Sequence, residues 1–105
     1  MKKEYDKLVR DKILKKLKLL NIGFGYHIAK DNEIQGRLYD KLDEECLEFK
    51  LNPCIEELAD IMEVLEAIAK FQNISLREVI EYKKKKKIMA GGFDNKIILE
   101  WTKEN

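Results

Sequence analysis

The stretch from Glu44 to Asp60 decides the fold, and it reads EECLEFKLNPCIEELAD. Asn52-Pro53 in its middle is a helix start signal, because asparagine caps free amide groups and proline suits the first helical position. The apolar residues on either side recur at helical spacing. The stretch therefore predicts two helices that run antiparallel and are joined by a short turn at Leu51-Asn52.

Two pairs of acidic residues flank this turn. Glu45 and Glu48 are three residues apart, as are Glu57 and Asp60, so each pair projects from one face of its helix. Across a two-residue turn, residues whose numbers have the same sum lie at one level, which places Glu45 opposite Asp60 and Glu48 opposite Glu57. Neighbouring helices lie roughly 8 to 10 Å apart, and carboxylates from both sides can bridge that gap with a metal between them.

Glu45 stands on the inward stripe of its helix, with Leu38, Leu42 and Phe49, where an apolar residue is the usual choice. Four carboxylates in a half-buried space repel each other unless a cation neutralises them, and oxygen ligands favour magnesium or manganese. The alternative is that these residues belong to solvated helix faces, since 39% of the chain is charged. For a single pair that alternative is favoured, but the mirrored spacing favours a metal site.

The remaining patterns complete a mainly α chain. Helices are predicted over about 11–20, from Asp31 or Asn32 to about 50, from Pro53 to about 72, and after the capping box that Ser75 opens, ending before Gly91-Gly92. Asp11 is a candidate cap of the first of these helices, and either Asp31 or Asn32 of the second. Aromatic and β-branched residues predict a minor pair of short β-strands near 26–29 and 96–101. At 105 residues, the chain is expected to form one domain, with a second copy helping to bury helix faces.

The composition argues against several classes of protein. The 21 basic and 20 acidic residues nearly cancel, so no general field draws in nucleic acid or an anionic membrane. Cys46 and Cys54 lack the CxxC spacing of a zinc or redox site, and the amino terminus is too charged for a signal peptide. No apolar stretch reaches the roughly 20 residues of a membrane span. We therefore expect a cytoplasmic protein with two unpaired cysteines and neither nucleic acid nor membrane as partner.

A hard metal site commonly binds phosphate, because magnesium keeps open positions that phosphate oxygens can take. Phosphate also needs basic partners, and the chain offers two sources of them. One is Lys7, Arg10 and Lys12 near the amino terminus. The other is the run from 83 to 87, in which Lys83, Lys86 and Lys87 are the candidates, although most lysines of such a run are only solvated.

These residues resemble the all-alpha nucleoside triphosphate pyrophosphohydrolases, also called MazG-like, which share an E-x-x-E then E-x-x-D pattern on two helices. A short branch of that family, labelled phosphoribosyl-ATP pyrophosphohydrolase-like, is the nearer likeness. Its members open with a Lys-Leu-Val-Arg-Asp-Lys stretch and end with Gly-Gly-Phe, as residues 7–12 and 91–93 do here. The resemblance covers nearly the whole chain.

The resemblance implies a four-helix MazG-like bundle that works as a dimer or tetramer and cleaves a nucleotide, with magnesium, to its monophosphate and pyrophosphate. By the match, Glu45, Glu48, Glu57 and Asp60 are the metal ligands. Glu44 also has a matching place and is expected to orient or deprotonate the attacking water. Lys7, Arg10 and Lys12 match the basic motif of the branch, which we assign to phosphate or subunit contacts.

Two positions depart from the branch: Leu14 replaces a common proline, and Ala90 replaces a basic residue that often precedes the glycines. The second removes a phosphate contact and leaves the substrate open among phosphoribosyl-ATP and standard, deoxy or damaged nucleotides. Turnover of damaged nucleotides would make the enzyme a house-cleaner of the nucleotide pool. Two alternatives remain, a non-enzymatic helical interaction module and a nucleic-acid binder that uses the lysine run. A di-iron bundle is disfavoured, because the only histidine, His27, lies outside any Glu-x-x-His motif.

Overall fold

The computed structural model describes all residues from 1 to 105 and contains four α-helices and no strand. In chain order the helices are α1 (Ile13–Leu19), α2 (Asp31–Leu51), α3 (Ile55–Phe71) and α4 (Leu76–Ala90). The prediction of a mainly α chain with four helices is confirmed. Each predicted helix is present within two residues of its expected bounds, except at the end of α4, for which only an upper bound was predicted.

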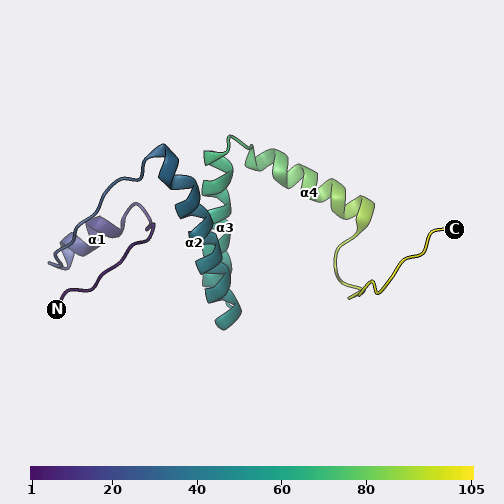
Figure 1. The fold of residues 1–105 in the computed structure, drawn as a ribbon, viewed down its shortest axis with the longest axis horizontal. Helices are drawn as coiled ribbons and strands as arrows, with labels where there is room; N and C mark the ends of the chain where they lie inside the picture. The colour runs from purple at the N-terminus through teal and green to yellow at the C-terminus, as the bar shows by residue number, and fades with distance from the viewer. The chain divides into compact units, whose positions relative to one another are not determined.

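The helices α2 and α3 pack side by side as an antiparallel hairpin (Figure 1). The turn between them is longer than predicted and spans 52–54, because α2 continues through Leu51 and α3 begins only at Ile55. Asn52 is the C-cap of α2, with its amide hydrogen bonded to the Glu48 carbonyl, so its predicted role as the cap of α3 is wrong. Pro53 lies in the turn and ends α2, since its ring cannot continue a helix.

The ends of the other helices follow their local chemistry in part. Ser75 is the N-cap of α4, and its hydroxyl accepts a hydrogen bond from the Glu78 amide at 3.3 Å, which confirms the predicted cap. Neither α1 nor α2 has a side-chain cap, so the predicted roles of Asp11, Asp31 and Asn32 as caps are wrong. Asp31 instead lies in the first turn of α2, where a carboxylate favourably meets the helix dipole.

The core of the chain is small and lies between α2 and α3. Its buried apolar residues are Leu38 on α2 and Val64 and Ala69 on α3. At the open end of the hairpin, the Gln72 amide donates to the Tyr39 hydroxyl at 3.2 Å, which ties the end of α3 back to α2. Most of the large apolar side chains stay exposed. Three buried apolar side chains therefore provide little hydrophobic stabilisation for a chain of this length.

The predicted pair of short β-strands is wrong. Residues 26–29 and 96–101 have no regular secondary structure, and the large apolar side chains Ile28, Ile97, Ile98 and Trp101 are all exposed. A strand is stable only where its backbone groups pair with a neighbour, and an isolated two-stranded ribbon is marginal even then. The β-branched content of these segments indicated a local preference and could not provide a pairing partner.

The segment before α1 is fastened to α2 by Arg37. Its guanidinium donates to the Asp6 carbonyl and to the Asp6 carboxylate, each at 2.9 Å, and its third contact is with Glu33 on its own helix at 3.0 Å. His27 lies against the same Glu33 carboxylate at 3.0 Å. These polar contacts hold the amino terminus and the 21–30 connection to the start of α2.

Internal contacts divide the chain into two compact units, Met1–Asn73 and Ile74–Asn105. The second unit contains α4, which ends at Gly91, where a φ of 85° requires the conformational freedom of glycine. None of the helices combines the length and apolar composition needed to cross a lipid bilayer. Cys46 and Cys54 are both free and half-buried, so the expectation that they are unpaired is confirmed.

Candidate metal centre

Glu45 is the one charged residue in the interior of the protein. It is only 6% exposed and lies on the face of α2 that meets α3. The apolar spacing of α2 puts it there, because Leu38 and Glu45 are two helical turns apart on the same stripe. Burying a carboxylate costs free energy unless it has hydrogen-bond or charged partners, so the groups that surround Glu45 are informative about its role.

The structure brings four other carboxylates close to that of Glu45. Oxygens of Glu45, Glu57 and Asp60 all lie within 4.8 Å of one another, and the same is true of Glu44, Glu45 and Glu48. The expected approach of Glu45 to Asp60 is present. Glu45 also meets Glu57, because Glu57 lies one helical turn before Asp60 on the same face of α3. Glu48 groups with Glu44 and Glu45 on its own helix.

Two oxygens of this cluster are buried and have no hydrogen-bond partner, namely Oε2 of Glu45 and Oε2 of Glu57. Burial raises the pKa of Glu45 above its ordinary value of 4.5, and the neighbouring Glu48 carboxylate raises it further, while Lys41 acts in the opposite direction. Buried acceptors without donors are rare in folded proteins because each one loses the hydrogen bonds it makes to water. Both oxygens therefore have free capacity for a positively charged ligand.

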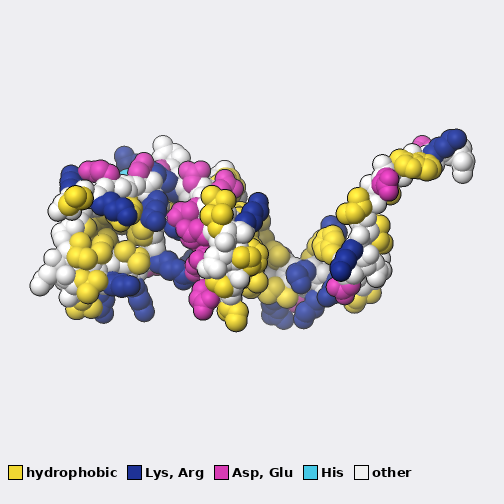
Figure 2. All heavy atoms as spheres, turned by 90° about the horizontal axis from the view of Figure 1, so that it is seen from below, with side chains coloured by type: hydrophobic (Ala, Val, Ile, Leu, Met, Phe, Trp, Pro, Cys, Tyr) yellow, Lys and Arg dark blue, Asp and Glu magenta, His cyan; other side chains and the backbone are white.

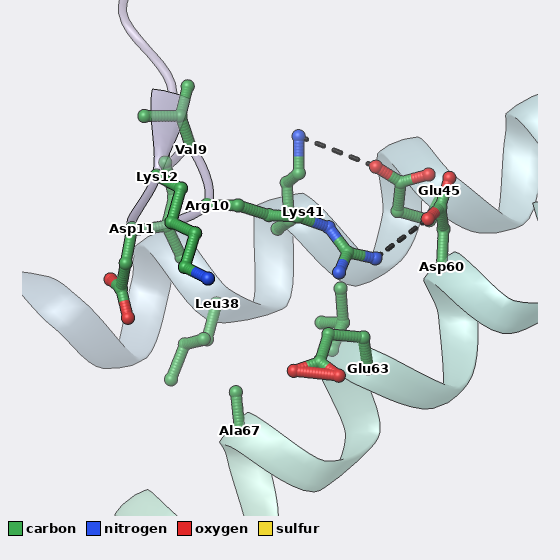
Figure 3. Close-up of a pocket in the computed structure, with 12 residues that line it drawn as sticks. Val9, Arg10, Asp11, Lys12, Leu38, Lys41, Glu45, Asp60, Glu63 and Ala67 are labelled. Carbon is green, nitrogen blue, oxygen red and sulfur yellow. Dashed lines mark hydrogen bonds and ion pairs between the residues drawn. The ribbon is translucent and has the colours of Figure 1, made fainter. Parts of the chain in front are cut away.

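Three basic side chains reach the cluster from α2 and from the segment before α1. Figure 3 shows Arg10 directed at Asp60 and Lys41 directed at Glu45. Arg10 donates to Asp60 Oδ1 at 2.7 Å, and Lys41 lies 3.4 Å from Glu45 Oε1 and 3.3 Å from Glu44 Oε2. Lys7 is 3.5 Å from the other Glu44 oxygen. Five carboxylates thus meet three basic groups, which leaves two negative charges without a partner. One divalent cation matches that excess.

A hollow of about 420 Å³ opens next to the cluster, between α2, α3 and residues 8–12. Its lining is apolar at Leu8, Val9, Leu38, Val64 and Ala67 and charged at Arg10, Asp11, Lys12, Lys41, Glu45, Asp60 and Glu63. Figure 2 shows acidic side chains gathered over the α2–α3 hairpin, beside basic side chains of the first part of the chain. The hollow has the size range of small-molecule sites and puts an apolar wall next to charged groups.

The basic residues expected to bind phosphate divide into three groups. Lys7 and Arg10 lie at the carboxylates themselves, whereas Lys12 lines the hollow without an ion pair. Lys83, Lys86 and Lys87 are exposed on α4, in the second unit, and their role in phosphate binding stays a prediction. The lone histidine, His27, pairs with Glu33 at the start of α2, and neither residue belongs to the carboxylate cluster around Glu45.

Lys41 is the residue of the site that the sequence reasoning missed. Its ammonium group touches both Glu44 and Glu45, and its side chain is only 16% exposed. The signal was present, since Lys41 precedes Glu45 by four residues, the spacing at which a lysine and a glutamate meet on one helical face.

The donor set fits a hard divalent cation. All five groups offer carboxylate oxygens, which Mg²⁺ and Mn²⁺ prefer, and no cysteine or histidine belongs to either group. Oxygens on opposite sides of a magnesium ion are about 4.2 Å apart, so separations of at most 4.8 Å are near the required distance. Glu45, Glu57 and Asp60 could hold such an ion, and Glu48 lies next to Glu45.

Comparison with known proteins identifies no relative of this chain, so any function must be argued from the residues described above. No protein-family model, no curated protein and no solved structure matches the chain.

Proposed function

We propose that this chain is a magnesium-dependent nucleoside triphosphate pyrophosphohydrolase, as the resemblance to the MazG-like family implies. It would hydrolyse the bond between the α- and β-phosphates, so that water adds to one phosphorus and the products are a nucleoside monophosphate and pyrophosphate. The observation that carries the proposal is the pair of buried, unpartnered oxygens of Glu45 and Glu57 beside Asp60. Such a cluster is stable at neutral pH when a cation neutralises it.

Each residue of the site has a proposed role that follows from its position. Glu45, Glu48, Glu57 and Asp60 would hold magnesium, which when bound polarises phosphate oxygens and lowers the pKa of water. Glu44 contacts Lys41 and Lys7, and it would orient or deprotonate the attacking water. Lys12 and Lys41 line the hollow and would draw the phosphate chain into it.

The proposal includes a second copy of the chain. Ile55, Leu58, Met62 and Leu65 recur at intervals of three and four along α3 and are all 46% exposed or more. Such a stripe is the usual apolar face of a packed helix, here without a covering partner in its own unit. Association into the dimer or tetramer of a MazG-like bundle would bury it, and sedimentation at micromolar concentrations would measure the mass of the particle.

The proposed activity is tested with a panel of nucleotides, including phosphoribosyl-ATP and standard, deoxy and damaged triphosphates. Pyrophosphate release is followed with magnesium, and the Glu48→Ala variant is the blank. Asp60→Ala is expected to abolish turnover while the far-ultraviolet circular dichroism stays helical. Glu56→Ala is the matched control, because Glu56 is exposed, precedes Glu57 and lies outside the cluster. Turnover by Glu48→Ala or Asp60→Ala at the native rate would refute the assignment.

The main alternative is a helical interaction module whose acidic patch meets a basic partner. That function predicts no stabilisation by magnesium, whereas a cation bound only by the folded state raises the apparent stability. The two buried oxygens without donors favour the metal site, since a docking patch works with exposed carboxylates. A thermal melt with and without 5–10 mM magnesium, about the concentration range of weak cation sites, separates the two functions.

A further inference from the structure

Arg10 occupies the place at the cluster where a cation would be expected. Its guanidinium donates to Asp60 Oδ1 at 2.7 Å (Figure 3). Asp60 shares a group of mutually close oxygens with the buried Glu45, whose Oε2 has no hydrogen-bond partner. The arginine thus neutralises one carboxylate of the set that would hold a metal. A divalent cation that uses both oxygens of Asp60, or that brings its own water shell, competes with this ion pair.

The contact is of a kind that breaks easily. The Arg10 side chain is 59% exposed and that of Asp60 is 38% exposed, and ion pairs this open to solvent contribute little to stability. Arg10 lies outside the helices, in the segment that leads to α1, so its side chain is not restrained by helix packing. Lys41, by contrast, is on α2 and mostly buried, and it remains beside Glu45.

Release of Asp60 would not release the segment. Four residues before Arg10, the backbone and side chain of Asp6 are held by Arg37 of α2, at 2.9 Å in both contacts. A freed guanidinium therefore stays beside the hollow that it already lines together with Lys12 and Lys41. An arginine kept there presents a planar fork of donors, which matches two oxygens of a phosphate group.

We propose that Arg10 is an internal counter-ion that exchanges partners: it pairs with Asp60 until a divalent cation displaces it, and it then binds a phosphate of the ligand. This inference rests on the proposed metal site. It makes cation and polyphosphate binding mutually dependent, because the cation releases the group that the phosphate needs. It also keeps the charge of the cluster low while no cation is bound.

The exchange predicts opposite effects of one substitution. Titration calorimetry with Mn²⁺ alone is expected to show two- to fivefold tighter binding to Arg10→Gln than to the native chain, since a competitor worth about 0.5 to 1 kcal/mol is gone. With saturating Mn²⁺, methylene diphosphonate, which cannot be hydrolysed, is expected to bind Arg10→Gln at least tenfold more weakly. The tenfold estimate is the low end for a lost charge-assisted hydrogen bond of about 1.5 to 3 kcal/mol.

Two further variants separate the specific contact from its general effects. Lys15→Gln removes the same charge from the neighbouring α1, where no ion pair reaches the cluster, and should leave both affinities within twofold of the native values. Arg10→Lys keeps the charge but loses the planar fork, so its diphosphonate affinity should fall between those of the native chain and Arg10→Gln.

The outcomes distinguish this inference from the proposed function. Suppose that Mn²⁺ binds Arg10→Gln no more tightly than it binds the native chain, or that Lys15→Gln gains as much Mn²⁺ affinity as Arg10→Gln. In either case the counter-ion exchange is overturned and the metal site stands. If Mn²⁺ binds neither the native chain nor Arg10→Gln, the metal site itself is wrong. Tighter Mn²⁺ binding with unchanged diphosphonate binding would keep the competition and overturn the transfer of Arg10 to phosphate.

Discussion

Lys41 Nζ lies 3.4 Å from Glu45 Oε1, one helical turn earlier on α2, while Glu45 Oε2 is buried without any partner. The lysine therefore satisfies half of the buried carboxylate. An interior carboxylate that serves only stability would have both oxygens satisfied, because each missing hydrogen bond costs about 1 to 3 kcal/mol. The unpaired Oε2 of Glu45 is consistent with a cation-binding site that lowers the stability of the protein while no cation is bound.

Glu45→Gln is expected to stabilise the cation-free protein at pH 7 by about 1 kcal/mol, because a neutral amide of the same shape avoids the desolvation of a charge. The new amide group can also donate to Glu57 or Asp60. Urea denaturation in the presence of EDTA measures the change. A variant less stable than the native chain at pH 7 would mean that the Lys41 contact outweighs the burial of the charge.

The stability of the cation-free protein should fall as the pH rises above 4.5. The pKa of Glu45 is raised above its ordinary value of 4.5, so the folded state binds its proton more tightly than the unfolded state does. The contribution of Glu45 to the free energy of unfolding is therefore fully present below pH 4.5, and it is lost as the pH rises through the pKa of Glu45 in the folded state. Glu33 has the opposite pH dependence, because its hydrogen bond with His27 lowers its pKa. Its contribution to the free energy of unfolding is present above pH 4.5 and is lost as the pH falls below that value.

The difference between the native chain and Glu45→Gln isolates this effect. Melting temperatures measured in EDTA from pH 4.5 to 7.5 should decline less for the variant, and the difference between the two curves should grow with pH. Parallel curves would show that Glu45 is not the group responsible.

The sequence predicted the four helices and the approach of Glu45 to Asp60. Glu45 and Asp60 could be paired from numbering alone, because a short turn forces two helices to run antiparallel and helical spacing fixes the rest. The turn spans 52–54 instead of the predicted Leu51-Asn52, and Glu57 shares a group of close oxygens with Glu45 and Asp60, while Glu48 shares one with Glu44 and Glu45.

What the sequence could not provide depends on distant contacts. Ile97 and Trp101 have the composition of a strand, but a strand also needs a partner, and no local pattern encodes one. The ion pair between Arg10 and Asp60 joins residues 50 positions apart, so no helical spacing predicts it. The resemblance had assigned Arg10 to phosphate or subunits, and the structure adds a carboxylate as its partner.

Leu38→Ala is expected to lower the free energy of unfolding by about 2 to 3 kcal/mol, at the lower end for a buried leucine because the core of the hairpin is small. Leu38 is 6% exposed and packs where α2 meets α3, so its loss leaves a gap under the hollow as well. Leu51→Ala is the control, since Leu51 is 77% exposed and should change stability by less than about 0.5 kcal/mol. Equal losses in the two variants would place the core elsewhere.

Removal of the cation should reverse a thermal stabilisation that depends on the cluster. At magnesium concentrations of about ten times the dissociation constant, binding adds about 1.4 kcal/mol, which corresponds to a rise of several degrees in melting temperature for a domain of this size. EDTA should abolish the rise in the native chain. Glu57→Gln should show no rise at all, whereas Glu56→Gln, one residue away and exposed, should respond as the native chain does.

Arg37→Gln should loosen the segment that carries Lys7 and Arg10 without unfolding the α2–α3 hairpin. The substitution removes both contacts to Asp6, and the loss of about 1 kcal/mol from a partly exposed, charge-assisted pair raises the open population about fivefold. Trypsin should then cleave after Lys7 and Arg10 correspondingly faster, as mass spectrometry of the fragments would show. Arg77→Gln is the control, because its ion pair with Glu81 lies within α4. Equal cleavage rates in the native chain and Arg37→Gln would mean that Arg37 does not hold the segment, and Arg10 would then have no tether to keep it beside the carboxylates.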